Sequence, residues 1–154
     1  MNHDNEYLPK VYRSVYHRAR LNVLFSASWM GEFIRRFMEK YDITGQQYNI
    51  LRIIHRNQGN HLSVLQLREQ MFEKMSDTSR LVDRLIAKGL VGKRKSTVDR
   101  RLVEIYLTTQ GEDLLTKILA GIEVLDLPLK GLTEEEAEIL SNLLVKMRRH
   151  ESNK

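Results

Sequence analysis

The sequence predicts a mainly α-helical fold with one small β-hairpin, and three observations lead to this prediction. Apolar residues recur at three-and-four spacing over much of the chain, which is typical of amphipathic helices. Several Ser and Thr residues have a Glu or Gln three positions later, a pattern that marks helix starts. The runs LVGKRKS and LVEIYL flank a short charged segment, which predicts a hairpin. With a length of 154 residues, the chain fits a single domain, residues 1–154.

Composition narrows the classes of protein and site that the chain can represent. It contains no cysteine, which excludes disulfides, thiolate zinc sites and cysteine nucleophiles. The five histidines are scattered, and no nucleophile elbow, phosphate-binding loop or His-Glu-x-x-His motif occurs. We therefore predict no enzyme, no cofactor and no metal site. The N-terminus lacks the apolar core of a signal peptide, and no run reaches the roughly 18 apolar residues that span a bilayer, so we expect a cytoplasmic protein.

The first predicted element is one long amphipathic helix over about residues 11–40. This segment contains no proline, and its apolar face includes Trp29, Phe33 and Phe37 at helical spacing. So many large apolar side chains favour core packing or a dimer interface over a cofactor site.

Two shorter helices are predicted next, and each begins with a capping box. Thr44 is paired with Gln47, and Ser63 is paired with Gln66. A tight turn is expected after the second of these helices, at about residues 72–75.

The helix after this turn has two distinct faces. Ser76 or Asp77 can cap its start. Its apolar face consists of Met75, Thr78, Leu81, Val82, Leu85 and Ile86. Its polar face consists of Ser76, Ser79, Arg80, Asp83, Arg84 and Ala87. Two short helices joined by a tight turn, the second with a polar outward face, are typical of a helix-turn-helix motif.

The predicted hairpin directly follows this helix. Gly89 can end the helix, and the two β-rich runs then surround a charged tip. A hairpin in this position is a wing, and its tip carries Asp99, Arg100 and Arg101 where a minor groove could be reached. An ordinary exposed hairpin with a charged tip is the alternative interpretation.

The position of the net charge points to a polyanion. Residues 76–101 hold eight Lys and Arg against three Asp, which accounts for the whole net charge of +5. Contacts with phosphates gain free energy from counterion release, so a surface that binds nucleic acid is expected to concentrate its charge in this way. A solvated helix face followed by a basic loop would give the same count, so charge alone leaves both interpretations open.

Residues 44–115 resemble the MarR (multiple antibiotic resistance regulator) family of bacterial winged-helix transcription regulators. The segment DRRLVEIYLT matches the family's wing pattern at four positions, Asp99, Arg101, Leu107 and Thr108. SRLVDRLIAKGLV is similar to the recognition helix and its exit, and LTTQGEDLL, with Gly111, to the start of a dimerisation helix. Two departures occur. Lys93 stands where the family usually has Arg, so the planar guanidinium group that can donate two parallel hydrogen bonds is replaced by an ammonium group. Bulky residues occupy positions 72–74, in a turn where the family commonly has small residues or glycine.

The predicted DNA contacts follow from the helix start and from the resemblance. Hydroxyl groups at a helix N-terminus can bind phosphates or base edges, and arginines one turn apart can do the same. The contacts expected from the recognition helix are Ser76, Asp77, Thr78, Ser79, Arg80, Asp83 and Arg84. As an alternative to contacting DNA, Asp83 can orient an arginine through an ion pair. The resemblance implies that Arg101 enters the minor groove and that Asp99 supports the tip. It places Lys93, Lys95 and Arg100 close to phosphate.

The C-terminal part of the chain predicts two further helices. Thr109 with Glu112 and Thr133 with Glu136 are candidate capping boxes, and Pro128 interrupts the chain between them.

These helices predict a partner. Their apolar stripes, together with the N-terminal one, exceed what a winged helix-turn-helix core of about residues 44–107 can cover. Helices at about 11–40 and 109–150 are therefore expected to form a twofold dimer. Packing within one chain is the alternative.

Together these features predict a homodimeric, sequence-specific transcription regulator, more specifically a repressor, on a pseudo-palindromic DNA operator. The resemblance implies release by a small-molecule effector bound between the dimerisation helices and the winged domain. The residues expected in that cleft are Trp29, Tyr48, Arg52 and His55, although packing explains the aromatic ones equally well. The alternative is an architectural or protein-interaction winged-helix protein with largely non-specific DNA binding.

Overall fold

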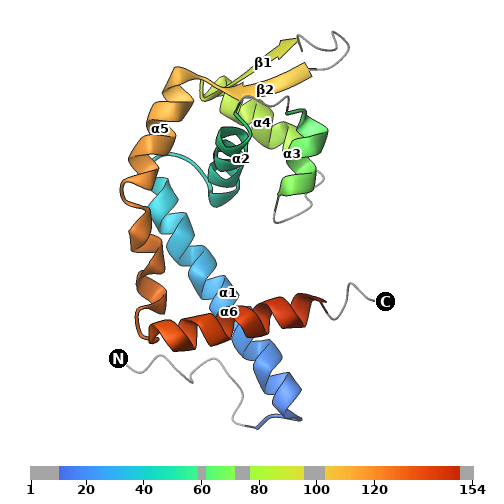
Figure 1. Cartoon of the computed structure of the whole chain (residues 1–154), viewed down its shortest axis with the longest axis vertical. Coiled ribbons are helices and arrows are strands. Elements are labelled where there is room, and N and C mark those ends of the chain that lie inside the picture. The colour runs from blue at the N-terminus through green and yellow to red at the C-terminus, as the bar shows by residue number, and fades with distance from the viewer. Residues whose placement is uncertain (1–10, 59–61, 72–76, 96–102, 150–154) are drawn as a thin grey trace. The chain divides into compact units, whose positions relative to one another are not determined.

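A computed structural model describes residues 11–58, 62–71, 77–95 and 103–149 and bears out the mainly helical fold with one hairpin (Figure 1). In chain order the elements are α1 (Val15–Glu39), α2 (Gly45–Arg56), α3 (Val64–Gln70), α4 (Thr78–Ala87), β1 (Val91–Lys95), β2 (Val103–Leu107), α5 (Thr109–Leu119), a 3-10 helix (Ile122–Leu129) and α6 (Glu134–Arg149). The chain divides into two compact units, Met1–Leu119 and Ala120–Lys154. The predicted single domain and its internal boundaries stay predictions.

Helix α1 exposes most of its apolar face. It begins after Ser14, whose hydroxyl accepts a hydrogen bond from the backbone N–H of His17 at 3.1 Å. Phe37 and Met38 are its buried residues, and they lie in the last turns. Earlier in the helix, Leu24, Phe25 and Trp29 are exposed.

Helix α2 is the centre of the first unit, where it packs against α1, α3, α4, α5 and β2. Ile50 and Leu51 on this helix are completely buried. The predicted capping box at its start is confirmed, because Thr44 and Gln47 exchange both hydrogen bonds. The same is true of Ser63 and Gln66 at the start of α3.

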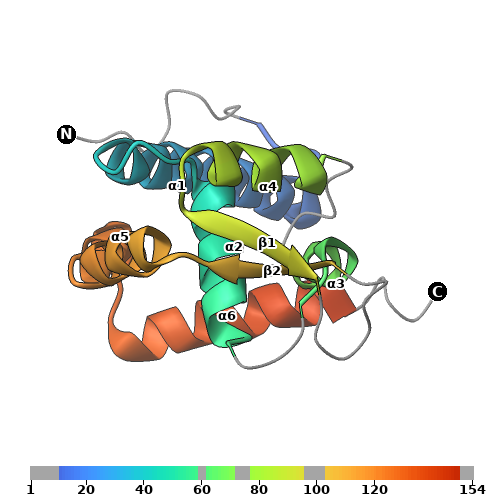
Figure 2. The same ribbon diagram turned by 90° about the horizontal axis from the view of Figure 1, so that it is seen from above.

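Helix α4 lies beside β1, as Figure 2 shows, and its apolar face packs inward. Leu81, Val82 and Leu85 are buried. The helix ends as predicted at Gly89, which has a φ of 72°, a left-handed conformation that costs glycine little.

The hairpin is antiparallel and short. Its register pairs Gly92 with Tyr106 and Lys93 with Ile105. Strand β2 is also tied to the helical part, since the Ile105 N–H donates to the Leu62 carbonyl at 2.9 Å. The predicted tip, which includes Asp99, Arg100 and Arg101, lies outside the described residues.

The start of α5 differs from its prediction. The hydroxyl that caps the helix belongs to Thr108, which accepts a hydrogen bond from the Gly111 N–H at 3.1 Å. The same hydroxyl donates to the Gly89 carbonyl at 2.6 Å. The predicted capping box of Thr109 and Glu112 was therefore wrong. Thr108 caps the helix instead, because its hydroxyl also bonds the Gly89 carbonyl at the end of α4.

The second unit contains the 3-10 helix and α6. Pro128 lies inside the 3-10 helix, so the chain is already out of α-helical geometry before it reaches this proline. The capping box of Thr133 and Glu136 is confirmed by hydrogen bonds of 2.8 and 3.2 Å. No residue of α6 is buried. Within the described ranges, no helix is long and apolar enough to cross a membrane.

Candidate nucleic-acid interface

The outward face of α4 carries four exposed polar side chains, Ser79, Arg80, Asp83 and Arg84. Thr78 does not belong to this face. Its side chain is buried, with 2% of the residue's surface exposed, and its hydroxyl donates to the sulfur of Met71 at 3.6 Å. A hydroxyl in this position cannot reach a groove while the helix start stays folded, which corrects the prediction that Thr78 contacts DNA.

Asp77 takes the N-cap position of α4 but makes no side-chain capping hydrogen bond. Its Oδ1 atom is buried and has no hydrogen-bond partner among the described residues. Ser76, the other predicted cap, lies outside those residues. The amide groups that open α4 are therefore not capped by the Asp77 carboxylate.

Arg80 and Arg84 are the exposed cations of this helix. In the part of the chain that the structure describes, neither takes part in an ion pair. Asp83 lies between them in the sequence but does not pair with either of them. This differs from the prediction that Asp83 orients an arginine.

Asp83 pairs instead with the wing. Its Oδ1 atom lies 2.7 Å from Nζ of Lys93 on β1, and both side chains are exposed. We predicted Lys93 close to phosphate, and the structure places it against a carboxylate of the recognition helix.

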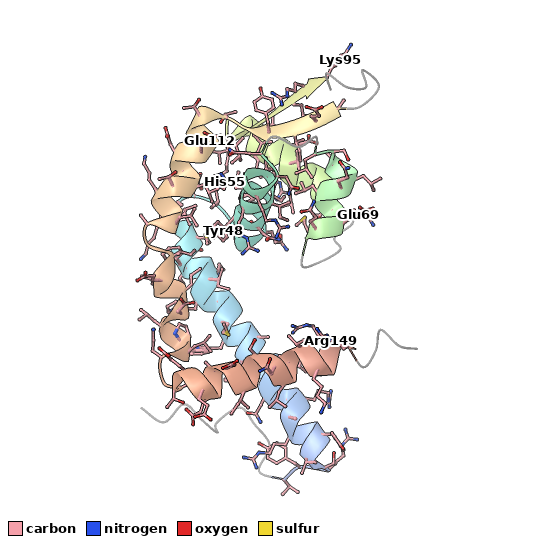
Figure 3. All side chains as sticks on the ribbon, viewed as in Figure 1. Tyr48, His55, Glu69, Lys95, Glu112 and Arg149 are labelled. Atoms are coloured by element: carbon pink, nitrogen blue, oxygen red, sulfur yellow. The ribbon has the colours of Figure 1, made fainter. Side chains whose placement is uncertain are left out.

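Lys95 is the last residue of strand β1, and Figure 3 shows it at the end of the hairpin away from α5. Within the described residues it forms no ion pair.

Arg94 is a wing residue that the sequence analysis missed. Its Nε donates to Oε2 of the buried Glu104 at 3.2 Å, and its guanidinium lies 5.2 Å from the centre of the Tyr106 ring. Arg94 and Glu104 are direct cross-strand partners. The signal was the opposite charge of two residues that a hairpin register would bring together.

The residues predicted for an effector cleft are only partly brought together. Tyr48, Arg52 and His55 share one face of α2, where Figure 3 labels Tyr48 and His55, whereas Trp29 lies half-exposed on α1. Burial raises the pKa of the Tyr48 hydroxyl, and the nearby guanidinium of Arg52 lowers it in part. A cavity of about 350 Å³ between the α1–α2 loop, the end of α4 and the start of α5 contains none of these four residues. The effector site stays a prediction.

A helix-turn-helix whose second helix exposes two arginines, followed by a basic hairpin, defines a winged-helix DNA-binding protein. Comparison with known proteins identifies its family. The sequence model described as "MarR family" matches residues 41–102. The HTH-type transcriptional repressor MdtR of Bacillus subtilis is 31% identical over 111 residues, which cover 71% of this chain and 70% of MdtR. The chain belongs to the MarR family, and it is a DNA-binding transcriptional regulator.

Solved structures agree with this assignment. The DNA complex of MepR from Staphylococcus aureus is 25% identical and covers 86% of this chain and 96% of MepR, with a TM-score of 0.74. A mutant of MarR from Escherichia coli, complexed with operator DNA, is 25% identical, with a TM-score of 0.73, and covers 84% of this chain and 91% of that one.

Proposed function

We propose that this regulator is a cytoplasmic, homodimeric repressor, without enzymatic activity, that reads a pseudo-palindromic operator and is released by a small-molecule effector. The MdtR relative is a repressor by name, and the MepR and MarR structures contain DNA. In this proposal Arg80, Arg84 and Ser79 contact DNA in the major groove. Lys95 anchors the wing to phosphate, and Ser76, Asp99, Arg100 and Arg101 remain predicted contacts.

The observation that carries the proposal is the freedom of Arg80 and Arg84. Both are exposed on the recognition helix, and neither is held in an ion pair among the described residues. Arginine to guanine is the commonest specific contact in the major groove. A pair of such arginines one helical turn apart therefore supports reading of sequence in addition to binding of phosphate.

The exposed apolar faces support the dimer. In one protomer, α1 exposes Leu24 and Trp29, and α6 exposes Ile139, Leu143 and Met147. Monomeric soluble proteins rarely expose large contiguous apolar patches, and their burial would stabilise an assembly by roughly 25 cal/mol per Å². A twofold dimer also presents two equivalent recognition helices to one side of a duplex.

Selection of bound sequences from a random DNA pool tests the proposal. We expect an inverted repeat with half-sites about one helical turn apart. Binding with no preferred sequence that disappears as salt is raised would instead support the architectural alternative.

The first mutational prediction separates base reading from phosphate anchoring. Arg80→Ala should cost roughly 1 to 3 kcal/mol on the selected operator and less on a scrambled duplex, because a base contact is sequence-specific. Lys95→Ala is the matched control. It should weaken binding to both duplexes about evenly and reduce the salt slope by roughly one unit. Fluorescence anisotropy on both duplexes across a salt series measures these effects. An unchanged ratio of cognate to scrambled affinity in Arg80→Ala would remove Arg80 from the base contacts.

A further inference from the structure

The Lys93–Asp83 ion pair joins the wing to the recognition helix at the point where base reading is proposed. The two charged atoms lie 2.7 Å apart, and the residues come from β1 and α4, which pack side by side (Figure 2). We infer that Lys93 is a positioning residue, which holds the Asp83 carboxylate against the wing and so leaves Arg80 free to read a base. This inference rests on the proposed function.

Another helix of the same chain shows that a carboxylate and an arginine three residues apart pair readily, there with a Glu that precedes its arginine. On α1, Glu32 and Arg35 are also three residues apart, and they form an ion pair at 2.7 Å. Glu32 is held further by Arg36, and the hydrogen bonds from Arg35 and Arg36 lower its pKa to about 2. Side chains three or four residues apart are neighbours on a helix surface, so such pairs form readily.

Asp83 stands three residues after Arg80, a spacing at which side chains are neighbours on a helix surface. An arginine that is already bound to a carboxylate must break that pair before it donates to a guanine. The Lys93 ammonium group prevents this competition by occupying the carboxylate. It also neutralises a negative charge that would otherwise repel the phosphates of the duplex.

The framework around Lys93 anchors the strand from which its side chain extends. Ile105, its partner in the hairpin register, is buried and bonded through its backbone to Leu62. Lys93 therefore starts from a strand that is anchored to the helical part. Lys95, two residues further along the same strand, has its side chain on the same face of the hairpin but no ion pair within the described residues, which makes it a matched comparison.

The test is a double-mutant cycle with DNA binding as the readout. Wild type, Lys93→Ala, Asp83→Ala and the double mutant are compared on the selected operator and on a scrambled duplex. We expect Lys93→Ala to weaken operator binding about fivefold or more and scrambled binding about twofold or less, since the base contact of Arg80 is what is lost. In the Asp83→Ala background the same change should alter operator binding by less than about twofold, because no carboxylate remains to capture Arg80.

Two further variants separate positioning from a direct contact. Lys93→Arg should keep the preference for the operator over the scrambled duplex that Lys93→Ala loses, since a guanidinium can also bind the Asp83 carboxylate. Lys95→Ala should lower affinity for both duplexes equally, with or without Asp83, as a phosphate contact does. Circular dichroism and thermal unfolding check each fold, and Asp83→Asn replaces Asp83→Ala if the latter does not fold.

Each outcome decides between defined alternatives. Suppose that wild type prefers its operator but that Lys93→Ala weakens binding to both duplexes equally, with or without Asp83. Lys93 is then a phosphate contact, and the inference is overturned while the proposed function stands. If wild type shows no preference for the selected operator, the proposed function fails and the inference fails with it. If Lys93→Ala loses the preference for the operator, and if the same change has no such effect in the Asp83→Ala background, the inference and the proposed function are both supported.

Discussion

Three glycines differ in how much space a methyl group would find. A Cβ atom on Gly111 would lie 2.1 Å from the backbone oxygen of Leu90, and one on Gly92 would lie 2.3 Å from Cζ of Tyr106. A Cβ atom on Gly31 would meet nothing within 4 Å. At Gly111 the obstacle is the backbone of Leu90, which cannot rotate away. At Gly92 the obstacle is the partly exposed ring of Tyr106, which can rotate away.

We therefore predict an order of stability among the three alanine variants. Gly111→Ala should destabilise the protein by about 1 to 3 kcal/mol or more, and Gly92→Ala by less. Gly31→Ala should stabilise α1 by up to about 1 kcal/mol, because alanine favours the helix. Urea unfolding of the three variants measures this order. Tyr106→Ala should reduce the cost of Gly92→Ala, and if it does not, the ring is not the obstacle.

At this scale, the sequence selects the charged residues of the proposed interface but not their partners. Lys93 and Asp83 were both selected from the sequence, yet their ion pair depends on how the hairpin packs beside the helix. Such packing is a property of the folded chain and leaves no mark in local spacing. The burial of Thr78, by contrast, was partly visible, because this residue falls on the apolar face of its helix.

Among the elements, the joint between α4 and α5 depends on one hydroxyl. Thr108 donates to the carbonyl of Gly89 and accepts from the amide of Gly111, so it serves the end of one helix and the start of the next. Its backbone N–H also donates to the carbonyl of Leu90 at 3.2 Å. The recognition helix is thereby tied directly to α5.

Replacing this hydroxyl with a methyl group should weaken the joint. Thr108→Val keeps the shape of the side chain but leaves two backbone groups without their partner, so we expect a loss of about 1 to 3 kcal/mol in the free energy of unfolding. Thr109→Val, at an exposed position next to it, should change stability by less than about 0.5 kcal/mol. Chemical denaturation of both variants provides the measurement. Equal effects would show that the hydroxyl of Thr108 does not hold the joint.

Helix starts were the elements best predicted from sequence, because a capping box depends on residues only three apart. The prediction failed at Thr109, because the preceding Thr108, which has no Glu or Gln three positions later, caps the helix while it also bonds the carbonyl of Gly89. Helix α5 ends at Leu119. The apolar stripe continues past Leu119, but Gly121 and Pro128 have low helix propensity, and the chain adopts a 3-10 helix there.

For the whole molecule, the sequence predicts that apolar stripes exist but not what covers them. Periodicity marks a helix face as apolar in the same way whether the neighbouring surface belongs to the same chain or to a second copy. In α6 the stripe includes Leu143, which is 59% exposed within one protomer. Exposure of this kind is information that only the structure supplies, and it leads to a prediction about assembly.

Leu143→Glu should dissociate the proposed dimer and leave each protomer folded. Burial of a leucine contributes roughly 1.5 to 3 kcal/mol, and a twofold interface contains the residue twice, so the dimer dissociation constant should rise on the order of a hundredfold or more. Leu65→Glu is the control, since Leu65 is 64% exposed but lies on α3 of the winged part. Sedimentation equilibrium should show a monomer for the first variant and a dimer for the second, with unchanged circular dichroism in both.

The monomeric variant should then bind one half-site about as well as the full inverted repeat, because a single recognition helix gains nothing from the second half. A Leu143→Glu protein that remains dimeric at nanomolar concentration would place the dimer interface away from this face of α6.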